Sequence, residues 1–325
     1  MKQLFLTFFV IIISALLISG CSNTGNISNP QNTNPDNQSS TWFIPGDFPT
    51  IGDAMNSSTV HNGDIIKLGT GNFTGVLLTK SLKFEGNGNT VINAGPAHSS
   101  GYSQGFRLGA GSDGSSFNHM TFTTDLSIMN GAAVNNVKVS HCEFLNSLQA
   151  ISNWCGSGWI IEHNTITDLK CANGGGIGIL VADLSGGTVQ GNQILHNTIT
   201  GVLHVDAENE GGGYSGTGIV IYADFRYGRF GTAAIKNNNV THNTISLTSE
   251  HPELVDVVAF ELTDTREEPP LPYVLNNNTI MFNDFRGTVN QIAISPAGLD
   301  NPVNNITRNL GENRGHGLHP GDFKP

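Results

Sequence analysis

A short repeated phrase constrains the fold of this chain more than any other feature. The phrase is His-Asn-Thr-Ile, and an apolar residue stands shortly before most of its copies. Such repeats are typical of a solenoid in which each coil passes through one tight bend between two short strands. The copies are His163–Ile166, His196–Ile199 and His242–Ile245, with degenerate copies that start at His119, His141 and Asn277.

The repeats predict an all-β, single-stranded, right-handed parallel β-helix over residues 42–306. Because coils stack at about 4.8 Å, we expect Asn164, Asn197, Asn243 and Asn278 to form an internal amide ladder. The alternative is a β-sandwich, which predicts polar hairpin turns such as Asn-Gly between alternating strands. The repeated bend favours the β-helix.

The first residues have the pattern of an export signal. One Lys precedes an apolar run from Phe5 to Ile18, followed by Ser19, Gly20 and Cys21. This pattern resembles a bacterial lipoprotein signal peptide over residues 1–20, which implies lipid modification of Cys21 and anchoring to a membrane. A transmembrane anchor is the alternative, but the run is short for a bilayer span. Ser22 resembles the outer-membrane sorting signal, so we expect an extracytoplasmic location in the cell envelope.

Two further segments flank the predicted solenoid. Residues 21–41 are almost wholly Ser, Asn, Thr, Gln, Pro and Gly, a composition that predicts a disordered tether. Residues 307–325 are predicted to form a C-terminal cap or tail. Within Pro49–Met55, Thr50 and Asp53 have the spacing of a helix N-cap, which predicts a short helix over the open end of the first coil.

The charge balance limits the partners of the folded domain. The chain has 26 acidic and 15 basic residues, with a formal net charge of −11. This balance disfavours nucleic acid and anionic lipid and is compatible with cation binding. We expect a monomer.

The opening of the predicted solenoid contains four characteristic segments, Phe48–Ile51, His61–Ile66, Gly71–Phe73 and Ser81–Gly88. These segments resemble the start of the pectin-lyase-like right-handed β-helix superfamily. The resemblance implies the fold, whereas the activity stays open, because that superfamily includes polysaccharide lyases, glycoside hydrolases, esterases and adhesins.

The spacing of the repeats indicates where the chain has insertions. From His163 to His196 is 33 residues, from His196 to His242 is 46, and from His242 to Asn277 is 35, whereas His119 to His141 is 22. The extra residues fall just before and just after one aligned strand. Stacked insertions of this kind predict two walls with a trough between them.

The floor of this trough is expected to carry a column of polar side chains, Asn153, Asp183, Asp224 and Asp264. Carboxylates at neighbouring positions repel, which raises one pKa for acid catalysis or favours a divalent cation. Since strand parity is ambiguous at Asp264, Glu261 is the alternative outward carboxylate. Surface ion pairs with the arginines that follow, Arg226 and Arg266, are the alternative interpretation of the motif.

The walls add candidate ligands. One wall contains His204, Asp206, Glu208 and Glu210, and oxygen-rich ligation of this kind suits calcium. Together with Asp224 and Glu261, Asp206 and Glu208 form the predicted metal site. Aromatic residues near these carboxylates are typical of a sugar-binding trough, because rings stack on the apolar faces of pyranoses. The predicted substrate-binding residues are Trp154, Tyr214, Tyr222 and Tyr227.

Two other features have competing interpretations. The aligned histidines from His119 to His242 could chelate copper or zinc, but His and Asn are also the residues that best tolerate a sharp bend. We favour the bend. Cys142 is predicted to be a buried thiol, and for Cys155 and Cys171 both a disulfide and separate thiols stay open.

These observations predict a lipid-anchored β-helix that binds a polysaccharide and cleaves it in one version of the hypothesis. As a lyase, calcium on Asp224 would neutralise a uronate while Arg226 or Arg266 abstracts the adjacent proton. As a hydrolase, two carboxylates among Asp183, Asp224 and Asp264 would act as acid and base. The alternatives are a non-catalytic adhesin or scaffold and a metal-handling protein that uses the histidine column.

The anchoring hypothesis predicts the effect of one substitution. Cys21→Ser removes the thiol that would carry the lipid, so the protein should leave the membrane fraction. Fractionation with metabolic lipid labelling measures this. Unchanged, lipid-labelled membrane association of the variant would contradict the prediction.

Overall fold

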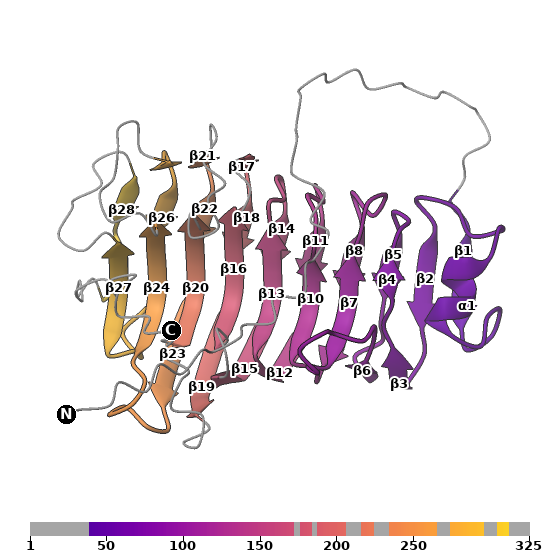
Figure 1. The fold of residues 1–325 in the computed structure, drawn as a ribbon, viewed down its shortest axis with the longest axis horizontal. Coiled ribbons are helices and arrows are strands. Elements are labelled where there is room, and N and C mark those ends of the chain that lie inside the picture. The colour runs from indigo at the N-terminus through magenta and orange to yellow at the C-terminus, as the bar shows by residue number, and fades with distance from the viewer. Residues whose placement is uncertain are drawn as a thin grey trace, which may run out of the picture.

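The chain winds into a single-chain parallel β-helix, as the repeats predict (Figure 1). The computed structural model describes residues 39–171, 176–183, 187–205, 216–223, 234–264, 274–295 and 304–311. Its strands belong to four sheets, and every pair of neighbouring strands is parallel. Successive coils therefore lie side by side along the long axis of the molecule.

Two sheets meet at the bend that contains the histidines. Sheet I has ten strands and sheet II has seven. The strands of sheet I are β1 (Thr41–Ile44), β2 (Ile65–Leu68), β5 (Lys83–Glu85), β8 (Ser116–Asn118), β11 (Lys138–Ser140), β14 (Ile160–Glu162), β18 (Gln193–Leu195), β22 (Asn239–Thr241), β26 (Thr279–Met281) and β28 (Asn305–Thr307). Those of sheet II are β3 (Gly71–Thr74), β6 (Thr90–Ala94), β9 (Thr121–Phe122), β12 (Glu143–Ser147), β15 (Thr165–Cys171), β19 (Thr198–Val205) and β23 (Thr244–Ser249).

The other two sheets complete each coil. Sheet III has eight strands and the short sheet IV has three. The strands of sheet III are β4 (Leu77–Leu78), β7 (Gln104–Leu108), β10 (Leu126–Asn130), β13 (Gln149–Trp154), β16 (Ile177–Asp183), β20 (Gly216–Ala223), β24 (Val257–Asp264) and β27 (Asn290–Ser295). Those of sheet IV are β17 (Thr188–Gln190), β21 (Ala234–Lys236) and β25 (Leu275–Asn276).

A short helix covers the first coil, as expected from the capping sequence. Helix α1 (Ile51–Asn56) begins after Thr50, whose Oγ1 accepts a hydrogen bond from the Asp53 backbone N–H at 3.1 Å. Its side chains Ile51, Ala54 and Met55 are buried in the interior cluster of the solenoid. The helix thereby removes apolar surface at this end from water.

Stacked side chains fill the inside of the coils. The phenyl rings of Phe122 and Phe144 stack at 4.9 Å, and those of Phe84 and Phe117 stack at 5.4 Å. Aliphatic residues such as Ile166 and Ile199 continue the same inward rows, fully buried. Each inward position thus contacts its equivalent on the next coil, which gives a continuous core along the axis.

The histidine of each repeat adopts a left-handed backbone conformation. The φ angle of His163 is 55°, and those of His196 and His242 are 55° and 58°. Few residues other than Gly, Asn and His adopt this conformation at low cost. The interpretation of the histidine as a bend residue is therefore confirmed.

The predicted amide ladder is present behind this bend. Asn164 donates from its backbone N–H and from Nδ2 to Oδ1 of Asn197, both at 3.0 Å. Asn197 makes the same pair of bonds to Oδ1 of Asn243, at 2.9 and 3.0 Å. Cys142 occupies the first position of the ladder and donates its backbone N–H to Asn164 at 3.0 Å.

The assignment of Asn278 to this ladder is wrong. After Asn243 the ladder continues through Asn283 and Asn309. Asn278 belongs to a second ladder at the bend before sheet I, in which Nδ2 of Asn238 donates to Asn278 at 2.9 Å. The members of this second ladder are Asn192, Asn238, Asn278 and Asn304.

The corrected register changes the coil lengths. The ladder bond from Asn243 to Asn283 spans 40 residues. The coil length expected from the repeats was 35 residues, from His242 to Asn277. The next ladder bond, from Asn283 to Asn309, spans 26 residues. The copy at Asn277 resembles the others because both bends need a left-handed residue followed by an inward Asn.

The ladder generates a stability prediction. Asn197→Ala removes the acceptor of two bonds from Asn164 and the donor to the Ile161 carbonyl at 2.9 Å. Buried groups left without partners cost about 1–3 kcal/mol, so the thermal unfolding midpoint should fall clearly. Asn72→Ala, at an exposed position of β3, is the matched control. Equal midpoints for both variants and the wild type would show that the ladder does not stabilise the coil.

Candidate functional site

The longer connections of the chain flank sheet III, as the insertions predict. Residues 206–215 precede β20 and residues 224–233 follow it, while residues 265–273 follow β24. Part of the extra length also extends the strands of sheet II, since β15 ends at Cys171 and β19 at Val205. Sheet III therefore presents its outer face at the part of each coil where the sequence departs most from the minimal repeat.

Two predicted substrate-binding residues lie in one row of this outer face. Trp154 pairs with Ala182, Ala182 pairs with Tyr222, and Tyr222 pairs with Thr263 across adjacent strands. Trp154 and Tyr222 are half-buried and pack on a small apolar cluster that is separate from the interior core. The cluster consists of Leu180, Ala182 and Val220.

Glu261 is an acidic residue of this face. It pairs with Val220 in register, is 4% exposed, and accepts hydrogen bonds from Thr217 Oγ1 at 3.2 Å and from Thr263 Oγ1. Burial raises the pKa of the Glu261 carboxyl, against the opposing effect of the two threonine hydroxyls. A buried carboxyl with a raised pKa is a candidate general acid. The interpretation of Glu261 as the outward carboxylate agrees with this placement.

The described members of the predicted polar column do not lie on adjacent strands at one position, and Asp224 lies outside the described residues. Asn153 pairs with Val181, and Asp183 pairs with Ala223, which in turn pairs with Asp264. Asp183 and Asp264 are thus two strands apart, at about 10 Å between strand axes, and Ala223 between them belongs to the interior cluster. The two aspartates are therefore not neighbours on the outer floor, and the mutual repulsion of adjacent carboxylates does not apply to them.

Asp183 contacts a cysteine, whereas the sequence predicted a neighbouring carboxylate or a divalent cation. The Cys155 thiol donates to Asp183 Oδ1 at 3.4 Å, and both residues are buried. Cys155 and Cys171 are not joined by a disulfide. Cys142 is a buried thiol, as predicted, and burial raises its pKa to about 12. A thiol with so high a pKa is unreactive at neutral pH.

The N-terminal half of the outer face carries polar groups that sequence reasoning missed. Gln104 and Arg107 of β7 align across β10 with Gln149 and Ser152 of β13, whose Oγ donates to Gln149 Oε1 at 2.7 Å. Gln104 is 1% exposed, and no donor among the described residues reaches its Oε1. An orphaned buried acceptor indicates a site for a water molecule or a ligand. Gln104 and Arg107 are three residues apart on one strand, so strict alternation would place them on opposite faces and gave no signal for this group.

Several predicted site residues lie outside the described residues. They are the lipidation residue Cys21, the catalytic candidates Asp224, Arg226 and Arg266, the metal-ligand candidates Asp206 and Glu208, and the ring residues Tyr214 and Tyr227. Among the residues that are described, no group of three His, Cys, Asp or Glu side chains is arranged to hold a metal ion. The described wall residues pair locally instead, with His204 Nδ1 at 3.4 Å from Glu250 Oε2.

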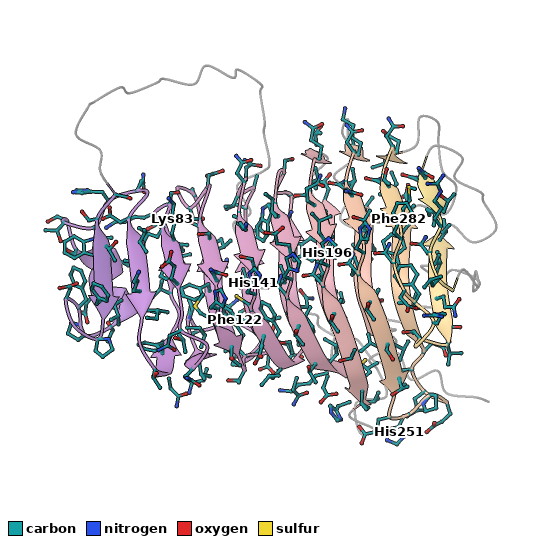
Figure 2. The ribbon with its side chains drawn as sticks, turned by 180° about the vertical axis from the view of Figure 1, so that it is seen from behind. Lys83, Phe122, His141, His196, His251 and Phe282 are labelled. Atoms are coloured by element: carbon teal, nitrogen blue, oxygen red, sulfur yellow. The ribbon has the colours of Figure 1, made fainter. Side chains whose placement is uncertain are left out.

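The histidine column is a continuous exposed stack. The rings of His141 and His163 lie 5.2 Å apart and those of His163 and His196 lie 5.0 Å apart, nearly parallel. Figure 2 shows His141, His196 and Phe282 in one row along the long axis. Two imidazole nitrogens that share one zinc ion lie at most about 4.2 Å apart. Parallel rings at this spacing place equivalent nitrogens too far apart for that, which argues against chelation by the stack.

Neighbouring imidazoles also affect proton binding in the stack. Desolvation and the adjacent His119 and His163 lower the pKa of His141. Within the described ranges, no helix is long and apolar enough to cross a bilayer.

The raised pKa of Glu261 predicts a pH-dependent effect on stability. The folded state holds this proton more tightly than the unfolded state. The stability that this proton contributes is therefore fully present below the ordinary glutamate pKa of 4.5 and is lost as pH rises through the higher pKa of the folded state. Glu261→Gln removes the ionisation, so the variant should unfold at a higher temperature than the wild type at about pH 8, with no such gain at about pH 4. Glu143→Gln, at an exposed position of β12, is the control. A constant difference at all pH values would contradict the prediction.

Comparisons with known proteins add little to this geometry. No family model matches the chain, and no curated protein matches it. Among solved structures, the crystal structure of PfbA, a surface adhesin of Streptococcus pneumoniae, aligns with 11% sequence identity and a TM-score of 0.27. The alignment covers 71% of this chain and 80% of that one.

Proposed function

We propose that this chain is an extracytoplasmic β-helix that binds a polysaccharide along the outer face of sheet III. The observation that carries the proposal is the row that contains Trp154 and Tyr222. The two residues stand on β13 and β20, about 10 Å apart between strand axes. A glycan chain laid along the solenoid axis would contact both rings, because each keeps part of its surface exposed.

Polar groups on the same face support this proposal. Gln104 offers an acceptor that no described residue satisfies, and Arg107 lies on the same strand. Hydroxyl groups of a sugar donate and accept hydrogen bonds, so they match the amide of Gln104, which aligns with Gln149 at the opposite end of β13 from Trp154. The mixture of ring faces and a few fixed polar groups is the usual composition of a small-molecule or glycan site.

Cleavage of the bound glycan is the second candidate function, and Glu261 is the observation that favours it. Its buried carboxyl with a raised pKa has the properties of a general acid. A calcium-assisted lyase that uses Asp224 with Arg226 or Arg266 remains a further form of this proposal. Without cleavage, the same face would serve an adhesin or scaffold, held at the cell surface by a lipid on Cys21.

Binding measurements test the proposal. The full chain is exposed to acidic and neutral glycans with and without calcium, and Tyr222→Ala is compared with the wild type. Loss of one stacked ring should weaken binding by about fivefold, which corresponds to about 1 kcal/mol. Phe43→Ala removes an exposed ring from β1, far from this face, and should not affect binding.

The same reactions separate the two functions. An unsaturated or reducing product that is lost in Glu261→Gln supports cleavage, whereas binding without product supports an adhesin. If no glycan binds, or if Tyr222→Ala and Phe43→Ala behave alike, the proposed face is not a glycan site.

A further inference from the structure

The outer face of sheet II carries a second ordered surface that the proposed glycan site does not use. In three consecutive strands the outward residues after the histidine are Thr165 and Thr167, Thr198 and Thr200, and Thr244 and Ser246. They pair in strict register from β15 to β19 and from β19 to β23. The single register irregularity of this region begins only after Thr167.

The array extends further toward the N-terminus. Thr121 and Thr123 repeat the pattern at β9, and between them and β15 the strand β12 places Glu143 and Leu145. Glu143 is therefore the one charged side chain among these outward positions. We call the eight hydroxyl-bearing residues the threonine array: Thr121, Thr123, Thr165, Thr167, Thr198, Thr200, Thr244 and Ser246.

Most hydroxyl groups of this array make no hydrogen bond to a described residue. Only two of them are engaged within the part of the chain that the structure describes: Thr121 Oγ1 donates to Glu143 Oε2 at 3.3 Å, and Ser246 Oγ donates to the Gly287 carbonyl at 3.4 Å. The hydroxyls of Thr165, Thr198 and Thr244 make no hydrogen bond to any described residue, and all three residues are exposed. They remain available to an external partner.

Strand stability does not account for this concentration of threonine. Thr is favoured in strands because its branched side chain suits a pleated surface, but sheet I has the same requirement on the same coils. Its outward residues are mixed, with Gln193 and Leu195 on β18 and Ile160 and Glu162 on β14. The uniform chemistry of the array is therefore specific to sheet II.

Fold geometry makes the array a regular net. Neighbouring strands lie about 4.8 Å apart and alternate residues of one strand about 6.6 Å apart. Branching at Cβ restricts χ1 of threonine, so hydroxyl and methyl positions repeat from coil to coil. The stacked imidazoles beside the array show the same regularity, with a centroid spacing of 5.0 Å between His163 and His196.

The chemistry of the net selects its partner. The array itself carries one carboxylate, Glu143, and no cation, so it offers little to an ionic polymer. The ion pairs Lys170–Asp125 and Arg286–Asp284 lie at its edges. Each threonine instead presents one hydroxyl, which binds water, beside one methyl, which cannot. Oxygen atoms on the prism faces of hexagonal ice repeat on a rectangular net of similar dimensions. Water molecules held by the hydroxyls would thus lie near lattice positions of ice, while the methyl groups occupy the spaces between them.

From this match we infer that the outer face of sheet II binds the prism face of ice. The surface lies on sheet II, away from the row of Trp154 and Tyr222 on sheet III. Its activity is therefore separable from glycan binding. The inference depends on the threonine array alone and stands or falls independently of the proposed function.

Ice growth in the presence of the full chain, purified in detergent, tests the inference. The wild type should shape growing crystals into facets and open a gap between melting and freezing temperatures. Thr198→Lys places a long charged side chain in the middle of the array, so this gap should fall to the level of a detergent-only control. Gln193→Lys, on the outer face of sheet I in the same coil, should keep the wild-type gap.

Thermal unfolding verifies that each variant is folded, and Thr165→Lys is a second array variant in case Thr198→Lys fails to fold. Glu261→Gln on sheet III should leave ice shaping unchanged. Absence of shaping and of a gap in the wild type overturns the inference, even if this face binds an insoluble glycan. Equal gaps for the wild type, Thr198→Lys and Thr165→Lys would also overturn it, because ice would then bind elsewhere.

Discussion

The two asparagine ladders are the interaction on which the rest of this solenoid depends. Each bend turns the chain so sharply that its backbone groups face inward, where water does not reach them, and a buried unpaired N–H or C=O is costly. An inward Asn satisfies these groups in the coils from Asn164 and Asn192 onwards. Asn197, for example, accepts from Asn164 and donates to the Ile161 carbonyl and to Asn243. A bend built in this way tolerates almost no change in length.

This constraint determines where the chain can vary. The two bends fix both ends of every sheet I strand, so added residues enter on the other side of the coil, around sheet III. Variable connections and irregular side chains such as Gln104 and Glu261 therefore gather on one face of the solenoid. Sheet II continues directly from the histidine bend and keeps its repeat, which is why its outward residues form a regular array. The same ladders thus produce one variable face and one periodic face.

The sequence repeats were sufficient to predict the fold, the left-handed histidines and the ladder through Asn243, because each depends on local backbone chemistry. Asn278 was misassigned since both bends require the same residue types, and only strand pairing distinguishes them. The aspartate column failed for a related reason. The Asp residues were treated as equivalent strand ends, but β20 ends at Ala223, one residue before Asp224. Pairing register depends on two neighbouring coils, so the sequence of one strand does not show which residue it faces on the next.

The same dependence on register explains why the histidine column is a poor metal site although its sequence suggests one. A chelating site needs nitrogens that converge on one point, whereas a parallel coil repeats each side chain by translation along the axis. Translation keeps the imidazoles parallel and separates His163 from His196 by the coil spacing, 5.0 Å between centroids. Periodic side chains on a solenoid therefore suit partners that are themselves periodic. Convergent chemistry requires the irregular face, where two hydroxyls, of Thr217 and Thr263, meet the carboxyl of Glu261.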